Sequence, residues 1–191
     1  SIEFLRKGSR SMIAEVSISV SLILIYFLDK FQDISLGGVI PLIQQHYNIK
    51  DAETGSLNTA TAIAHTGTLA LVWIFGDMFK RRRLFLVCVT LWITLVVLSI
   101  VLGLNSFMVF VIFHALAASV SSVMNILIPV ILADILQDRE LGVALMFVSM
   151  AEIAASMLSD IASSWIVTST IPWQTAILSS TLLTIGPLLV I

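Results

Sequence analysis

The sequence carries little charge. Lys and Arg number 10 and Asp and Glu 12 among 191 residues, so 12% of the chain is charged and 58% is hydrophobic. A soluble domain carries roughly 25% charged residues, and a 20.9 kDa chain with about half that share cannot cover a water-facing surface. The composition therefore nearly excludes a water-soluble enzyme.

Cysteine is scarce as well, since Cys88 is the single one. One cysteine excludes an intrachain disulfide framework and a cysteine-only metal site. No dense patch of basic residues alternates with aromatic residues, which argues against nucleic-acid binding. The sequence shows no nucleophile beside a base, no metal-ligand cluster and no phosphate loop, so we expect neither enzyme activity nor a cofactor or metal.

Long apolar runs fill most of the chain. A membrane-spanning helix needs about 20 mostly apolar residues, and six runs qualify, at 13–34, 55–75, 84–104, 107–133, 141–165 and 172–191. They predict an all-α membrane protein with a six-helix transmembrane bundle over 13–191, after a cytoplasmic segment 1–12. A signal peptide is the alternative for the first run, but the run is too long and includes Asp29 and Lys30.

The connections between the runs are of two kinds. Residues 36–53 contain glycine, proline and charged residues and predict a wet loop, whereas Asn105–Ser106 predict a tight turn. Pro172 suits the first turn of the last helix, where its missing N–H is not needed. The chain opens with Ser1, so we expect a fragment or a processed product.

Lys and Arg residues gather at one end of the predicted spans. If the spans alternate in direction, eight of these residues fall on one side: Arg6, Lys7, Arg10, Lys80, Arg81, Arg82, Arg83 and Arg139. Lys50 falls clearly on the other side. By the positive-inside rule we expect a multi-pass protein whose N-terminus and loop 76–83 are cytoplasmic and whose loop 36–53 is not.

The loop at 76–83 begins with an acid and ends with a run of basic residues. Asp77 can accept hydrogen bonds from a neighbouring helix N-terminus, and such a clasp can break and re-form as two helix bundles rock. The alternative is that the basic residues only anchor one face of the protein. Composition alone favours this second interpretation.

This stretch resembles the conserved loop of the major facilitator superfamily, Gly-x-x-x-Asp-Arg-x-Gly-Arg-Arg. Asp77, Arg81 and Arg82 match, whereas the chain departs from the pattern at Trp73, Met78 and Lys80. The resemblance implies a conformational-switch loop, for which we expect six residues: Gly76, Asp77, Arg81, Arg82, Asp134 and Arg139.

Two further segments resemble spinster-like transporters of that superfamily. Residues 38–49 are similar to the loop after the first helix of that family, and residues 129–134 match its Pro-x-x-x-Ala-Asp. The resemblance runs from about Tyr26 to Trp173 and implies a twelve-helix fold of which this chain supplies the N-terminal six. The missing partner is then the C-terminal half of the transporter or another subunit.

What the spinster-like resemblance implies for function is lipid transport. Members of that family move lysolipids and sphingoid lipids, including sphingosine-1-phosphate, at lysosomal, endosomal or plasma membranes. The chain is therefore expected to belong to a secondary active transporter that moves such amphiphiles by alternating access.

Several positions depart from the spinster-like pattern. In the fourth helix the family carries an arginine and, seven residues later, a glutamate that are associated with proton coupling, and here these positions are His114 and Ser121. Glu152 stands where the fifth helix of the family has a proline. These departures leave two alternatives open. One is a non-transporting truncated isoform or pseudotransporter that binds a partner or lipid, and the other is a facilitator that carries another small organic solute.

Ionisable side chains inside the predicted spans are the candidate site. Each costs at least about 2.5 kcal/mol in the bilayer unless it is paired or wet, so it indicates function by default. Asp29, His65, His114 and Glu152 qualify. We expect them, with Ser121, to form a substrate- or proton-coupling site in a cavity between the first, second, fourth and fifth spans, where His114 and Glu152 replace the missing pair.

A structural alternative competes for the same residues. Asp29 can pair with Lys30 at a wet interface, and His65 can bond Thr61 or Thr68 along its own helix. Lys30 is the one basic residue clearly within a span. A cavity with so little positive charge favours a neutral or cationic amphiphile over an anionic head group.

Overall fold

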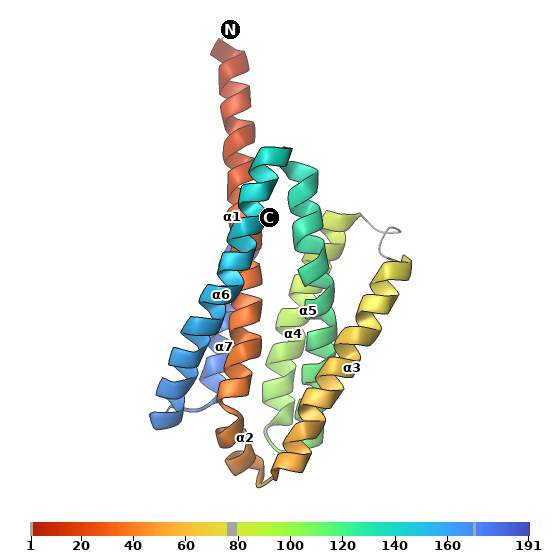
Figure 1. Ribbon diagram of the computed structural model, residues 1–191, viewed down its shortest axis with the longest axis vertical. Coiled ribbons are helices and arrows are strands. Elements are labelled where there is room, and N and C mark those ends of the chain that lie inside the picture. Colours follow the sequence, from red (N-terminus) through yellow and green to blue (C-terminus); the bar gives the residue numbers. More distant parts are fainter. Residues whose placement is uncertain (1, 76–79, 170) are drawn as a thin grey trace.

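The computed structural model describes residues 2–75, 80–169 and 171–191, and all regular secondary structure in these ranges is helical. The helices are α1 (Ile2–Gly38), α2 (Ile40–Tyr47), α3 (Asp51–Phe75), α4 (Arg81–Gly103), α5 (Phe107–Ile135), α6 (Asp138–Thr168), α7 (Gln174–Leu183) and α8 (Ile185–Leu188). The long helices run alongside one another, and the short helix α2 lies at one end of them (Figure 1).

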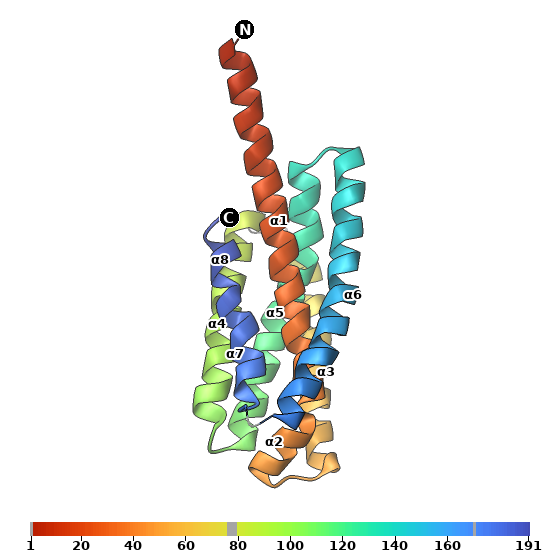
Figure 2. The same ribbon diagram turned by 90° about the vertical axis from the view of Figure 1, so that its left-hand side faces the viewer.

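Helix α5 is the central element of the bundle. It packs against α4 and α3 and also contacts α1 and α6, while α1 packs along α6. Helix α7 lies beside both α1 and α4 (Figure 2). Large apolar side chains such as Phe85, Trp92 and Phe110 fill the space between these helices and are fully buried. Polar residues on the inner faces of α1 and α5 are therefore enclosed by protein.

The connection between α4 and α5 confirms the turn predicted at Asn105–Ser106. The Ser106 N–H donates to the Gly103 carbonyl over 2.9 Å, which reverses the chain within three residues. A Cβ on Gly103 would lie 2.8 Å from the Phe110 Cβ. Glycine at this position thus allows the two helices to approach closely.

Helices fill most of the segment 36–53, where the sequence predicts a wet loop, and its place outside the membrane stays a prediction. Helix α1 continues to Gly38, α2 follows, and α3 begins at Asp51. Val39 and Ile43 are fully buried, so this segment packs on the end of the bundle. Pro41 lies in the first turn of α2, where a proline is tolerated, and Asn48 ends the helix in the left-handed region at φ 52°.

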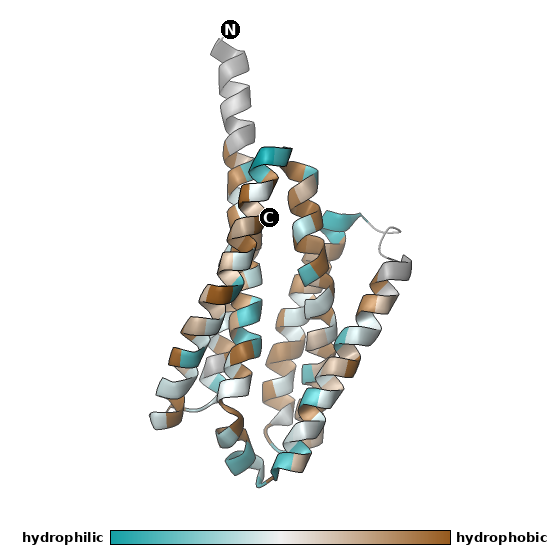
Figure 3. Ribbon diagram, in the orientation of Figure 1, coloured by the Kyte–Doolittle hydropathy of each residue, from teal (hydrophilic) through white to brown (hydrophobic). Residues whose placement is uncertain are grey.

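Within the described residues, three helices have the length and apolar composition needed to cross a membrane: α4, α5 and α6. The other predicted spans correspond to α1, α3 and the pair α7 and α8, so the count of six stays a prediction. The last run divides into two short helices because Pro187 lacks the N–H that would bond the Leu183 carbonyl one turn earlier. Figure 3 shows hydrophobic residues along the bundle, with hydrophilic residues at its ends and at a few interior positions.

Candidate functional site

A small polar cavity lies inside the bundle between α1, α3, α4 and α5. Its volume is about 40 Å³, and the polar residues that line it include Asp29, Lys30, Asp33, His65, His114 and Ser121. The cavity has room for water but not for a lipid, because one water needs about 10–15 Å³ of such space. It brings together four of the five residues predicted for the coupling site.

Asp29 is the most enclosed charged group of this cavity. Asp29 is 2% exposed, and the Ser121 hydroxyl donates a hydrogen bond of 2.8 Å to its Oδ2. The Asn125 amide donates in turn to the Ser121 Oγ over 3.4 Å. The carboxylate of α1 is thus held by a short polar chain on α5.

Lys30 does not pair with Asp29, although the two are neighbours in sequence. Among the described residues, an ion pair forms between Arg81 and Asp134, and none involves Lys30. The Lys30 Nζ instead lies 5.5 Å from the centroid of the Tyr26 ring, at a distance typical of a cation–π contact. The predicted alternative of an Asp29–Lys30 pair is therefore wrong.

His114 faces the same cavity from α5. It is 3% exposed, and its ring stacks on Phe110 with centroids 5.7 Å apart and an interplanar angle of 13°. Its Nδ1 is buried and has no hydrogen-bond partner in the described part of the chain. A buried polar atom without a partner is rare in proteins and calls for an explanation such as water or a bound ion.

His65 approaches the cavity from α3 and is half-buried. The hydroxyls of Thr61 and Thr68 donate to the carbonyls of Leu57 and Ala64 in their own helix. Neither threonine bonds His65, so the structural alternative predicted for this histidine is wrong. Its ring remains beside the cavity, where water can reach it.

Glu152 departs from the predicted site, since it does not line the polar cavity. It lies on the exposed surface of α6, and its Oε2 accepts a hydrogen bond of 3.0 Å from the Tyr26 hydroxyl of α1. The expectation that one cavity gathers all these residues is wrong for Glu152. The physical reason is that α6 packs along α1, so its carboxylate meets Tyr26 at that contact.

Sequence reasoning missed Tyr26 and Gln32, the latter 3% exposed. A signal for Tyr26 exists in the spacing of polar residues along the first helix. Tyr26, Asp29 and Asp33 follow one another at intervals of three and four residues, and such residues share a helix face. A polar stripe of this kind within an apolar helix predicts a surface turned toward other polar groups.

The predicted switch residues are divided between two places. The Arg81 Nη1 contacts both carboxylate oxygens of Asp134, over 2.8 Å and 3.0 Å, and this ion pair joins the start of α4 to the end of α5. Arg82 donates to the Ile191 carbonyl. Gly76 and Asp77 lie outside the described residues, and Arg139 lies apart from the ion pair, at a groove between α1 and α6.

No group of three or more His, Cys, Asp or Glu side chains in the described ranges is arranged to hold a metal ion. The chemistry that the polar cavity offers is therefore that of a buried carboxylate, two imidazoles and water. Side chains of these types are common in proton-relay sites.

Comparison with known proteins gives two findings. A family model described as Major Facilitator Superfamily matches residues 22–191. Protein spinster homolog 1 of Xenopus laevis is 24% identical over 124 residues, which are 62% of this chain and 23% of that protein. The chain thus matches less than a quarter of the length of this relative.

Proposed function

The chain belongs to the major facilitator superfamily, and from that premise we propose that it forms the N-terminal six-helix bundle of a secondary active transporter. Membership points to an integral membrane protein that transports rather than to an enzyme. In alternating access, two such halves rock around a site between them. The observation that carries the proposal is the buried Asp29 carboxylate, which the bundle encloses with His65 and His114 beside a water-sized cavity.

We propose that Asp29 is the coupling group of this transporter. A carboxylate at this depth is costly, and it is retained in membrane proteins mainly where an ion or proton must bind. The Ser121 hydroxyl bonds it in place of the glutamate that the spinster-like pattern carries there. His114, with its unpartnered Nδ1, then exchanges protons with Asp29 through water in the cavity.

Glu152 takes a different role in this proposal. Because it bonds Tyr26 outside the cavity, it positions α1 against α6 rather than relaying protons. The Lys30 Nζ lies over the ring of the same tyrosine, within cation–π distance. The three residues together fix the face of α1 that carries Asp29.

The Arg81–Asp134 pair supports a conformational switch at the end of the bundle. Both side chains are about half exposed, at 44% and 50%. An exposed ion pair of this kind contributes at most about 1 kcal/mol. A bond this weak can form in one state of the transporter and break in the other without blocking the cycle.

The proposed substrate is a lysolipid or sphingoid amphiphile, as the resemblance to spinster-like transporters implies. The polar cavity is too small for it, so it binds between this bundle and the C-terminal half. The proposed orientation places the N-terminus in the cytoplasm, because the basic residues of 80–83 and Arg139 mark one end of the bundle. The proposed setting is a lysosomal, endosomal or plasma membrane.

Transport into proteoliposomes tests this function. The bundle is reconstituted together with its C-terminal half, and uptake of a fluorescent lysophosphatidylcholine is followed with and without an imposed pH gradient. We expect uptake above that of empty liposomes, and faster uptake with the gradient. Lipid binding without uptake supports the pseudotransporter instead, and uptake of a small organic solute without lipid uptake supports the other facilitator alternative.

A further inference from the structure

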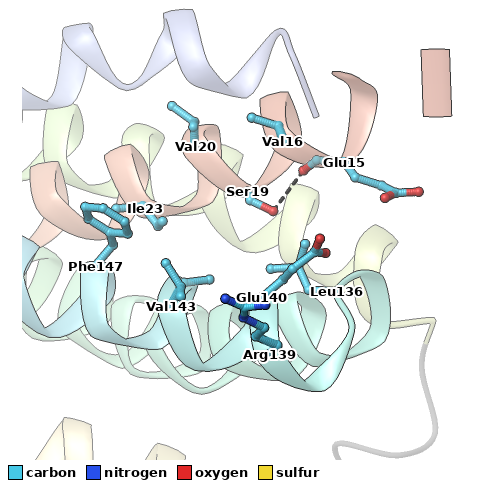
Figure 4. A pocket seen from close by; sticks show the side chains of 11 residues that line it. Glu15, Val16, Ser19, Val20, Ile23, Leu136, Arg139, Glu140, Val143 and Phe147 are labelled. Atoms are coloured by element: carbon cyan, nitrogen blue, oxygen red, sulfur yellow. Dashed lines mark hydrogen bonds between the residues drawn. The ribbon is translucent and has the colours of Figure 1, made fainter. Parts of the chain in front are cut away.

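A groove runs along the outside of the bundle between α1 and α6, and it is separate from the polar cavity. Its volume is about 470 Å³. The walls of this α1–α6 groove are apolar side chains from both helices, namely Val16, Val20, Ile23, Val143 and Phe147 (Figure 4), together with Ala144. Four of them are about half exposed, at 49–55%: Val16, Val20, Val143 and Phe147.

One end of the groove is charged. Arg139 and Glu140 line it there, with Glu15 on the facing helix, and the apolar walls lead away from them (Figure 4). Over the described residues, the structure records no hydrogen bond or ion pair for the side chain of either Arg139 or Glu140. A guanidinium and a carboxylate thus stand side by side at the mouth of an apolar groove, both open to a ligand.

The dimensions of the groove restrict its occupant. From Glu15 to Ile23 the groove follows α1 for about 12 Å, at a rise of about 1.5 Å per residue. A single acyl chain is narrow enough to enter the groove.

The charges of the mouth restrict the head group. Arg binds phosphate with two parallel hydrogen bonds, so Arg139 suits a lipid phosphate. The adjacent Glu140 repels a head group that carries only negative charge, but it attracts an ammonium group. A head group that contains both a phosphate and an ammonium matches both residues at once.

We propose that the α1–α6 groove binds one zwitterionic phospholipid of the bilayer, with an acyl chain along its apolar walls and the phosphate and ammonium at Arg139 and Glu140. This lipid is a bound component of the bundle and not the transported substrate. The proposal does not depend on the function proposed above, because it uses neither Asp29 nor the polar cavity.

Native mass spectrometry of the purified protein tests the head-group contacts. The detergent-solubilised protein is titrated with phosphatidylcholine, phosphatidylglycerol or lysophosphatidylcholine, and the bound lipids are counted. We expect one phosphatidylcholine to be retained in preference to phosphatidylglycerol. Arg139→Gln weakens that binding at least about tenfold, because the charge-assisted hydrogen bonds of the guanidinium to the phosphate are lost. Glu140→Gln reduces the preference over phosphatidylglycerol. Arg83→Gln is the matched control, since Arg83 is exposed at the same end and does not line the groove.

A second pair of variants tests the apolar part of the groove. Val143→Trp fills the space between the helices and is expected to abolish phosphatidylcholine retention. Met146→Trp, at an exposed position of α6 outside the groove, leaves it unchanged. If Val143→Trp lowers the helical circular dichroism signal, this variant is misfolded, and the comparison of Arg139→Gln with Arg83→Gln alone tests the proposal.

Four results overturn the proposal. The first is equal retention of phosphatidylcholine and phosphatidylglycerol by the unchanged protein, and the second is an Arg139→Gln effect no larger than that of Arg83→Gln. The third is loss of the bound lipid in Asp29→Asn, which assigns the lipid to the transport site instead. Retention of no lipid at all also overturns the proposal and favours a protein helix as the occupant.

Discussion

Asp29 of α1 and Ser121 of α5 are joined by a hydrogen bond of 2.8 Å across 92 residues of sequence. This contact places a carboxylate inside an apolar bundle and gives it a hydroxyl partner from the central helix. A charged group in such a position is stable only while its partners remain. The contact therefore supports both the packing of the bundle and the proposed coupling chemistry.

Removing the serine hydroxyl tests the packing role. Ser121→Ala leaves the Asp29 carboxylate without its nearest donor, and we expect a loss of about 1–3 kcal/mol of stability. The measurement is the thermal unfolding midpoint in detergent. Ser119→Ala is the control, because the Ser119 hydroxyl bonds the Ala115 carbonyl of its own helix. Equal midpoints for the two variants contradict a structural role for the Asp29–Ser121 bond.

Charge reversal tests the switch at the end of the bundle. Arg81→Asp or Asp134→Arg alone breaks the ion pair, and we expect each to raise the accessibility of cysteines placed in the proposed inter-bundle site while changing stability by about 1 kcal/mol or less. The double reversal restores the pair with exchanged charges and returns accessibility toward its original value. A double variant that behaves as the sum of the single variants shows that the pair does not control the conformation.

Substitution of Gly103 tests the close contact between α4 and α5. Gly103→Ala places a Cβ 2.8 Å from the Phe110 Cβ and 3.0 Å from its Cα, and we expect a loss of about 1–3 kcal/mol from overpacking. Gly55→Ala in α3 is the control, because a Cβ there meets nothing within 4 Å and alanine favours a helix by about 0.5–1 kcal/mol. The thermal midpoints of the two variants should move in opposite directions, and a common direction contradicts this description of the contact.

The Tyr26–Glu152 bond separates a positioning role from a proton relay. Glu152→Gln keeps an oxygen that accepts from the Tyr26 hydroxyl, so we expect pH-driven uptake to stay within about twofold of the unchanged protein. Tyr26→Phe removes the bond and lowers the unfolding midpoint by the equivalent of about 1.5–3 kcal/mol, as for a bond to a charged group. Loss of pH-driven uptake in Glu152→Gln, with the midpoint unchanged, assigns Glu152 to the relay after all.

Local signals in the sequence predicted local features of the structure. The structure confirms the turn at Asn105–Ser106, between α4 and α5. Two polar residues between long apolar runs are enough to predict a turn there. The segment after Gly38 was missed although its signals are also local. Val39 and Ile43 lie four residues apart, on one helix face, with Pro41 at a first-turn position. The glycine, proline and charged residues of 36–53 favoured the interpretation as a loop over this helical pattern.

The sequence predicted less well which residues share the candidate site. Ionisable residues within apolar runs can be recognised from the sequence, and three of them, Asp29, His65 and His114, line one cavity in the structure. The direction in which a side chain faces depends on the neighbours that its helix acquires. Glu152 was misplaced for that reason, since the packing of α6 on α1 turns it toward Tyr26. The number of spans and their orientation in the membrane stay predictions.

Comparison of pH-driven accumulation with counterflow in proteoliposomes tests the central claim that Asp29 couples transport to protons. Counterflow exchanges labelled for unlabelled lysophosphatidylcholine without net proton movement, whereas accumulation requires the coupling group. We predict that Asp29→Asn abolishes accumulation under a pH gradient and keeps counterflow, and that Asp160→Asn, at an exposed position of α6, keeps both. Accumulation by Asp29→Asn at the rate of the unchanged protein would contradict the claim.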